Sequence, residues 1–75
     1  MQQDITVHNK VRVARVERGL TQQELADLVG VTRQTIGLIE VERYNPTLHL
    51  CFLLSRVLTK RLEELFWVEE TSDAN

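Results

Sequence analysis

Apolar residues recur at helical spacing through most of the chain, and turn-forming residues divide this region into successive predicted helices. The first predicted helix follows Asn9, which we take as its N-cap, and ends at Gly19, a residue suited to the left-handed conformation that terminates helices. Its inward positions are expected to be Val11, Val13 or Ala14, and Val16. The spacing therefore predicts a short amphipathic helix at the N-terminal side of the chain.

Two further helices follow with clear start and stop signals. Thr21 and Glu24 form a capping-box pattern, and Gly30 marks the end of the helix that Thr21 begins. Thr32 caps the next helix, expected over about residues 33–41. The inward residues of this pair are predicted to be Leu25, Leu28, Val29, Ile36 and Ile39.

The C-terminal half adds two more predicted helices. Pro46 breaks the chain and Thr47 caps a helix over about residues 48–58, which carries more apolar residues than one inward stripe needs. A short fifth helix covers residues 62–65. Strand patterns occur at residues 4–8 and 66–68, and these two strands could pair antiparallel. The expected fold class is thus mostly α, with one domain over residues 1–70 and a disordered tail over 71–75.

The size of the chain limits how it can be stabilised. A domain of 75 residues buries only about 60% of its unfolded surface, and so commonly needs a disulfide, a metal or a partner subunit. Cys51 is the single cysteine, and His8 and His49 do not have metal-ligand spacing. We therefore predict no metal and no cofactor, and expect self-association instead.

Charge and targeting signals narrow the class of protein. No signal-peptide pattern and no apolar run long enough for a membrane span occur, so we predict a cytoplasmic protein with no membrane partner. The net charge of −2 does not by itself suggest nucleic acid. However, residues 9–45 hold six basic against five acidic side chains (+1), while residues 1–8 carry −1 and residues 46–75 carry −2.

The segment 26–39 has the properties of two helices packed across a tight turn. Ala26 is small enough for a close helix crossing, and Gly30 supplies the positive φ of the turn. Val31, Ile36 and Ile39 are placed to fill the angle between the helices. This arrangement fits a helix-turn-helix, in which the second helix enters the major groove of DNA.

This string of residues resembles the Cro/cI-type helix-turn-helix family, whose lambda-repressor-like domains have five helices. The resemblance extends over about residues 9–68 and is closest to small stand-alone bacterial or phage regulators. The matching segments are RGLTQQELA (18–26), GVTRQTI (30–36), IE (39–40), YNPTL (44–48) and LEELF (62–66).

The resemblance implies roles for individual residues. Expected contacts to the DNA backbone come from Gln22, Thr32, Thr35, Arg43, Tyr44 and Asn45. It also implies that Arg15 and Glu40 form a structural ion pair. With Ile36 and Ile39 inward, the residues expected to face the bases are Arg33, Gln34, Gly37 and Leu38.

The sequence departs from the family pattern at three places. Thr59-Lys60-Arg61 replaces a usual Gly-hydrophobic-Ser segment, and Val41-Glu42 replaces a usual Asn-Gly pair. Leu53 stands where a charged residue is common, which predicts extra apolar surface.

The aromatic segment at residues 66–68 is open to two interpretations. It could pack wholly on the domain's own core, or it could join Leu53 in a homodimer interface made of Leu53, Phe66, Trp67 and Val68. We favour the dimer. The resulting hypothesis is a non-enzymatic transcriptional regulator, in this family most often a repressor, that binds an inverted repeat in double-stranded DNA and has no small-molecule ligand. The alternative is a protein-interaction module, antitoxin-like or adaptor, that keeps the same fold.

Overall fold

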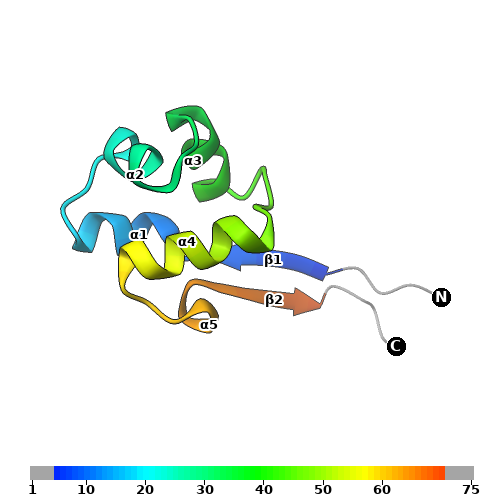
Figure 1. Ribbon diagram of the computed structural model, residues 1–75. Coiled ribbons are helices and arrows are strands. Elements are labelled where there is room, and N and C mark those ends of the chain that lie inside the picture. Colours follow the sequence, from blue (N-terminus) through cyan, green and yellow to red (C-terminus); the bar gives the residue numbers. More distant parts are fainter. Residues whose placement is uncertain (1–4, 71–75) are drawn as a thin grey trace.

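The computed structural model describes residues 5–70, which form five helices and a two-stranded sheet (Figure 1). The predicted tail at 71–75 and the first residue of the predicted strand, Asp4, lie outside the described residues. The elements in order are β1 (Ile5–Asn9), α1 (Val11–Glu17), α2 (Gln22–Val29), α3 (Arg33–Glu40), α4 (Leu48–Leu58), α5 (Leu62–Leu65) and β2 (Phe66–Glu70). The mostly α, five-helix fold expected from the sequence is confirmed.

The helix boundaries follow the capping residues. The hydroxyl groups of Thr21, Thr32 and Thr47 each accept a hydrogen bond from the backbone amide three residues later, at the start of α2, α3 and α4. The Glu24 carboxylate also accepts from the Thr21 amide at 2.8 Å, which completes the capping box. Gly30 ends α2 with φ +79°, the left-handed conformation that glycine adopts without a Cβ clash.

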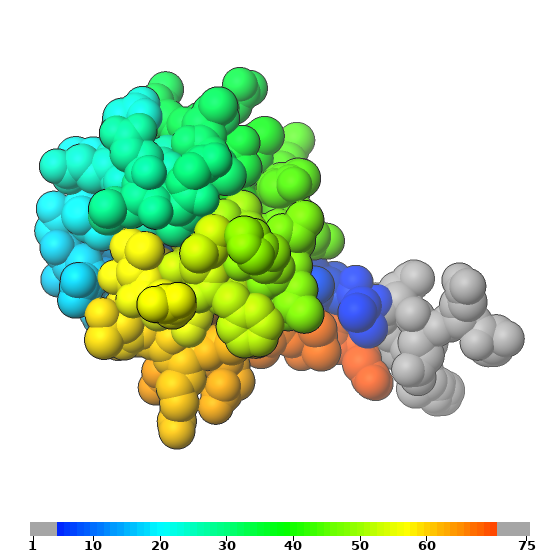
Figure 2. Space-filling view, viewed as in Figure 1, coloured from blue at the N-terminus to red at the C-terminus, as the bar shows by residue number. Residues whose placement is uncertain are grey.

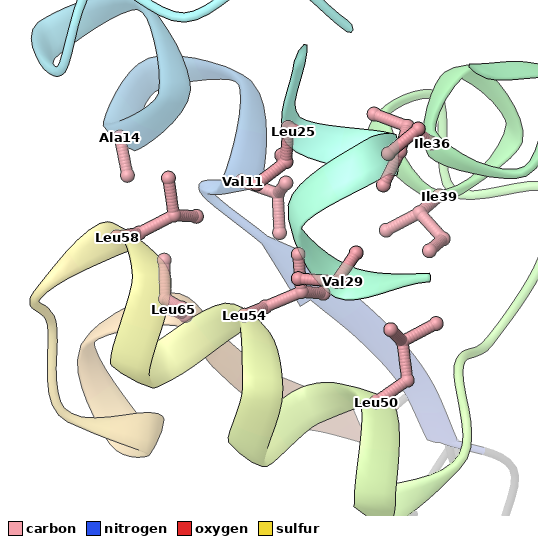
Figure 3. Packing of buried hydrophobic residues seen from close by; sticks show 11 residues of the cluster. Val11, Ala14, Leu25, Val29, Ile36, Ile39, Leu50, Leu54, Leu58 and Leu65 are labelled. Atoms are coloured by element: carbon pink, nitrogen blue, oxygen red, sulfur yellow. The ribbon is translucent and has the colours of Figure 1, made fainter. Parts of the chain in front are cut away.

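A single cluster of apolar side chains fills the space between the helices (Figure 3). Leu54 of α4 is fully buried and lies near Val29 of α2, while Ile36 and Ile39 of α3 reach the same cluster from the far side of α2. Leu65 of α5 closes it at the other end. Burying one such side chain stabilises the fold by about 1.5–3 kcal/mol. Because Ile36, Ile39 and Val29 share this core, it fixes how α3 packs against α2.

The two strands pair antiparallel and bring the ends of the described chain together. Val7 lies opposite Val68, and His8 lies opposite Trp67. Since successive side chains alternate between the faces of a sheet, Phe66 and Val68 share one face and Trp67 lies on the other. The possible pairing of the terminal strands is therefore confirmed, with both strands ending later than expected.

Three expectations from the sequence were wrong. Asn9 belongs to β1 rather than capping the first helix, although its Oδ1 still accepts from the Val11 amide at 3.0 Å. Val16 is 60% exposed, because α1 buries Val11 and Ala14 and Val16 stands on the opposite face. Leu28 is 58% exposed, because α2 turns the stripe of Leu25, Ala26 and Val29 inward and Leu28 falls outside it.

Candidate nucleic-acid interface

Helices α2 and α3 are joined by a turn of three residues, Gly30 to Thr32. The amides of Gly30 and Val31 both donate to the carbonyl of Ala26, at 2.8 and 3.0 Å, which satisfies the end of α2. Ala26 is fully buried, and Val31 packs partly buried against the core. The segment therefore has the compact helix-turn-helix geometry that the sequence predicted.

The outward face of α3 carries the side chains that the sequence assigned to base contacts. Arg33, Gln34 and Leu38 are exposed, and Gly37 is half-buried. Together α2 and α3 form one end of the molecule, shown in cyan and green in Figure 2. Because Ile36 and Ile39 hold the inner face of α3 in the core, this outer face is free to meet another molecule.

The first turn of α3 presents two hydroxyl groups. Thr32 is exposed and Thr35 is half-buried, and their Oγ1 atoms lie 3.0 Å apart. The Thr32 Oγ1 also accepts from the Thr35 amide at 3.2 Å. A hydroxyl can donate and accept at once, so this pair keeps donor capacity for an acceptor that approaches the helix N-terminus.

A chain of polar contacts connects α1, α2 and α3 beneath this face. Arg15 Nε donates to Glu40 Oε2 at 2.6 Å, so the two residues implied to pair do so. Gln22 Nε2 donates to Glu40 Oε1 at 3.0 Å, and Arg33 Nη1 donates to Gln22 Oε1 at 3.1 Å. The structure thus brings together two expected DNA-contacting residues and the ion pair, a connection that the sequence pattern did not indicate.

The loop after α3 exposes the three remaining candidates, Arg43, Tyr44 and Asn45. The second residue of this loop, Glu42, has φ +63°. A non-glycine residue in this conformation costs on the order of 1 kcal/mol or more. The loop keeps a left-handed residue where the family's glycine usually stands.

The Glu42 carboxylate is bonded on both oxygens, which holds this strained residue in place. Oε2 accepts from the Asn9 amide at 3.1 Å, and Oε1 lies 3.0 Å from His8 Nδ1. His8 Nε2 lies 2.7 Å from Glu69 Oε1. Hydrogen bonds to Glu69 and Glu42 raise the pKa of His8 above its usual 6.5. Both ring nitrogens can donate to carboxylates only when the imidazole is protonated.

The departure from the family pattern at Thr59-Lys60-Arg61 is also stabilised by side-chain hydrogen bonds. Thr59 ends α4 with φ +58°, again a left-handed residue without glycine. Arg18 Nη1 donates to Thr59 Oγ1 at 3.1 Å, and the Ser55 hydroxyl donates to the Lys60 carbonyl. The Glu64 carboxylate accepts from the Arg61 amide at 2.8 Å, so α5 is capped without the usual serine.

The four residues expected at a dimer interface do not share one flat surface. Leu53 and Phe66 are partly buried against the chain's own core, whereas Trp67 and Val68 are exposed on opposite faces of the sheet. The structure also exposes two large apolar side chains of α4 outside the predicted interface set, Leu48 at 65% and Phe52 at 52%. The excess of apolar residues in that helix was their sequence signal.

Other candidate chemistry is sparse in residues 5–70. Within that range no group of three or more potential ligands could hold a metal ion. None of the described helices is long and apolar enough to cross a membrane. Cys51 is buried, and desolvation raises the pKa of its thiol, which suits a neutral packing residue.

Comparison with known proteins agrees with this geometry. The profile of the helix-turn-helix family matches residues 11–65. An HTH-type transcriptional regulator of Methanothermobacter thermautotrophicus is 48% identical over 61 residues, covering 80% of this chain and 88% of that protein. One from Archaeoglobus fulgidus is 43% identical over 60 residues, covering 80% and 86%. The restriction-modification controller protein C.AhdI from Aeromonas hydrophila superimposes with a TM-score of 0.67 and 31% identity, covering 72% of this chain and 82% of that one. The chain therefore belongs to the helix-turn-helix family of the Cro/cI type, whose members are DNA-binding transcriptional regulators.

Proposed function

We propose that this protein binds an inverted-repeat operator as a homodimer, with α3 of each subunit in the major groove. The observation that carries the proposal is the two-sided character of α3. Its inner face is anchored by fully buried Ile36 and Ile39, and its outer face presents exposed Arg33 and Gln34. A helix held rigidly in this way can place side chains on base edges with fixed geometry.

The outer face of α3 supplies donors that match purine bases. Arg33 can donate twice to guanine O6 and N7, and Gln34 can pair with adenine N6 and N7. Leu38 is 40% exposed and offers an apolar contact suited to a thymine methyl group. Gly37 has no side chain, so the backbone of α3 can approach the groove closely at this position.

The surrounding polar residues are placed to bind phosphates on either side. Gln22, Thr32 and Thr35 lie at the beginnings of α2 and α3, where backbone amides and side chains favour anions. Arg43, Tyr44 and Asn45 are exposed in the loop that follows α3. Such contacts fix the position of a protein on the duplex without selecting sequence.

The dimer proposal rests on the apolar surface of the C-terminal half. Trp67 and Val68 are 41% and 55% exposed on opposite faces of the sheet, so the proposed interface would extend around β2 to bury both side chains. Leu53 and Phe66 would lie at the inner border of this interface, since they already touch the core. Replacing Trp67 with glutamate should give monomers in sedimentation analysis, and an unchanged mass would count against the interface.

We favour repression by occlusion of a promoter as the mode of regulation. The protein would act in the cytoplasm, on DNA located there. Occupying a promoter requires only stable binding at the site, which α2, α3 and the following loop can supply. No small-molecule ligand or cofactor is needed for this mechanism.

Selection from a random duplex library, in a stated moderate salt concentration, tests the proposal directly. We expect an inverted repeat with half-sites about 34 Å apart, or one helical turn. Replacing Arg33 with alanine should then cost about 1–3 kcal/mol at one base position per half-site. A loss of equal size on every sequence would make Arg33 a phosphate contact instead.

A protein-interaction module remains the second candidate, because Leu48 and Phe52 are exposed and the net charge is −2. Salt dependence separates the two functions. DNA binding weakens steeply as salt rises through counterion release, whereas binding through an apolar surface does not.

A further inference from the structure

We propose that Glu40 is a positioning residue for base selection, which acts by fixing the Gln22 side-chain amide and, through it, the direction of the Arg33 guanidinium. The inference rests on the proposed function, since it concerns how Arg33 chooses its base. It assigns Glu40 a role beyond the stabilising ion pair with Arg15.

The Glu40 carboxylate is the buried centre of the polar contacts beneath α3. Its side chain is only 3% exposed, at the C-terminal end of α3. It accepts from Arg15 Nε at 2.6 Å and Arg15 Nη2 at 3.2 Å. Its Oε1 also accepts from Gln22 Nε2 at 3.0 Å. Arg15 of α1 supplies the positive charge that this buried carboxylate requires, and the carboxylate bonds the side-chain amide of Gln22 in α2.

The chemistry of the pair allows only one orientation of the Gln22 amide. A carboxylate accepts hydrogen bonds but has no proton to donate, whereas the glutamine amide has one donor end and one acceptor end. The inverted amide would place Gln22 Oε1 against Glu40 Oε1, two acceptors in contact. Glu40 therefore forces the Gln22 nitrogen inward and its oxygen toward Arg33.

The Gln22 oxygen then holds one edge of Arg33. Arg33 Nη1 donates to Gln22 Oε1 at 3.1 Å, although Arg33 itself is exposed. The guanidinium is planar and its donors form a rigid fork, so one fixed bond limits where the other N–H groups point. The remaining donors are sufficient for a two-bond contact with guanine. Selectivity for guanine at this position should therefore depend on Glu40.

Arg15 provides a matched control, because it binds the same carboxylate. Its remaining Nη1 donates to the Leu20 carbonyl at 2.9 Å rather than to Gln22 or Arg33. Arg15→Lys perturbs the ion pair and keeps the positive charge that compensates Glu40. Glu40→Gln is nearly isosteric, but its amide can both donate and accept, so Gln22 can adopt either orientation.

The experiment measures dissociation constants for the selected operator and for operators changed at the base that Arg33→Ala identifies. The base ratio is the dissociation constant for the changed operator divided by that for the selected operator. In the wild type it should be about 5- to 150-fold, which corresponds to a two-bond contact. We expect Glu40→Gln and Gln22→Ala each to lower this ratio several-fold, with no further loss in the double variant. Arg15→Lys should keep the ratio while lowering the unfolding midpoint.

A second measurement on the free protein separates this inference from the proposed function. The NMR order parameter of the Arg33 Nε–H group should be higher in the wild type and Arg15→Lys than in Glu40→Gln or Gln22→Ala. Equal order in all four proteins would overturn the inference, as would an unchanged base ratio in Glu40→Gln. Equal loss of the ratio in Arg15→Lys would reduce Glu40 to a structural role. If the wild type binds all duplexes alike, the proposed function fails, and the order parameters still decide whether Glu40 positions Arg33.

Discussion

Replacing Gly37 with alanine should strengthen the fold and weaken DNA binding. Gly37 lies inside α3 and is not among the positive-φ residues, so alanine can adopt its backbone conformation. A Cβ built there meets only Gln22 Nε2 at 3.8 Å, which is ordinary van der Waals contact. The substitution therefore acts through the higher helix propensity of alanine, which should raise the free energy of unfolding by about 0.8–1 kcal/mol.

Gly30→Ala is the matched control, because it adds the same methyl group at a glycine of the same unit. No atom beyond its neighbours along the chain lies within 4 Å of the Cβ position, so packing contributes nothing in this case either. The difference is the backbone, since Gly30 has φ +79° and alanine in the left-handed region costs about 1–2 kcal/mol. The two substitutions should therefore change stability in opposite directions.

Urea unfolding followed by circular dichroism measures both changes through the midpoint at constant slope. For a domain of this size, 1 kcal/mol corresponds to a shift of about 4–8 °C in Tm. A fall in stability for Gly37→Ala would refute the geometry described for α3. Operator binding should weaken, because the added methyl lies on the face proposed to approach the groove. Unchanged affinity in the more stable variant would show that α3 stands away from the DNA at this point.

Three further predictions concern the core, a helix cap and pH. Leu54→Ala should lower the free energy of unfolding by about 2–5 kcal/mol, because the side chain is fully buried and its removal leaves a cavity. Urea denaturation measures this change, and a loss below about 1 kcal/mol would contradict the central position of Leu54. Thr47→Ala should lower the free energy of unfolding by about 1 kcal/mol, because it removes the hydroxyl that caps α4; urea denaturation measures this, and unchanged stability would contradict the role of the cap. Because Glu69 and Glu42 raise the pKa of His8 in the folded state, the stability that His8 contributes is complete below about pH 6.5 and is lost as pH rises through the higher folded pKa. Thermal unfolding between about pH 5.5 and 8.5 should show this loss in the wild type and not in His8→Gln, and identical profiles would exclude the contribution.

The sequence predicted the outward face of α3 but not the contacts beneath it. Helix periodicity predicts that Arg33 and Gln34 face outward, and both are exposed on α3. Periodicity could not show that Gln22 bonds both Glu40 and Arg33, because these contacts join residues on two helices whose crossing is set by the core. Their roles on DNA remain predictions.

The local signals in the sequence determined most of the secondary structure. Threonine caps and the glycine at position 30 act within one helical turn, so Thr21, Thr32 and Thr47 could be identified as helix starts from neighbouring residues alone. The family resemblance added the order of the helices and the identity of the turn between α2 and α3.

The tertiary structure decided the features that depend on distant parts of the chain. Burial at Val16 and Leu28 depends on which neighbours cover each helix, and no neighbour in the described part of the chain covers these two. Glu42 and Thr59 adopt left-handed conformations without glycine because His8, Asn9 and Arg18 bind them from other elements. Such contacts offset local backbone strain only after the chain has folded, so no short-range pattern in the sequence can reveal them.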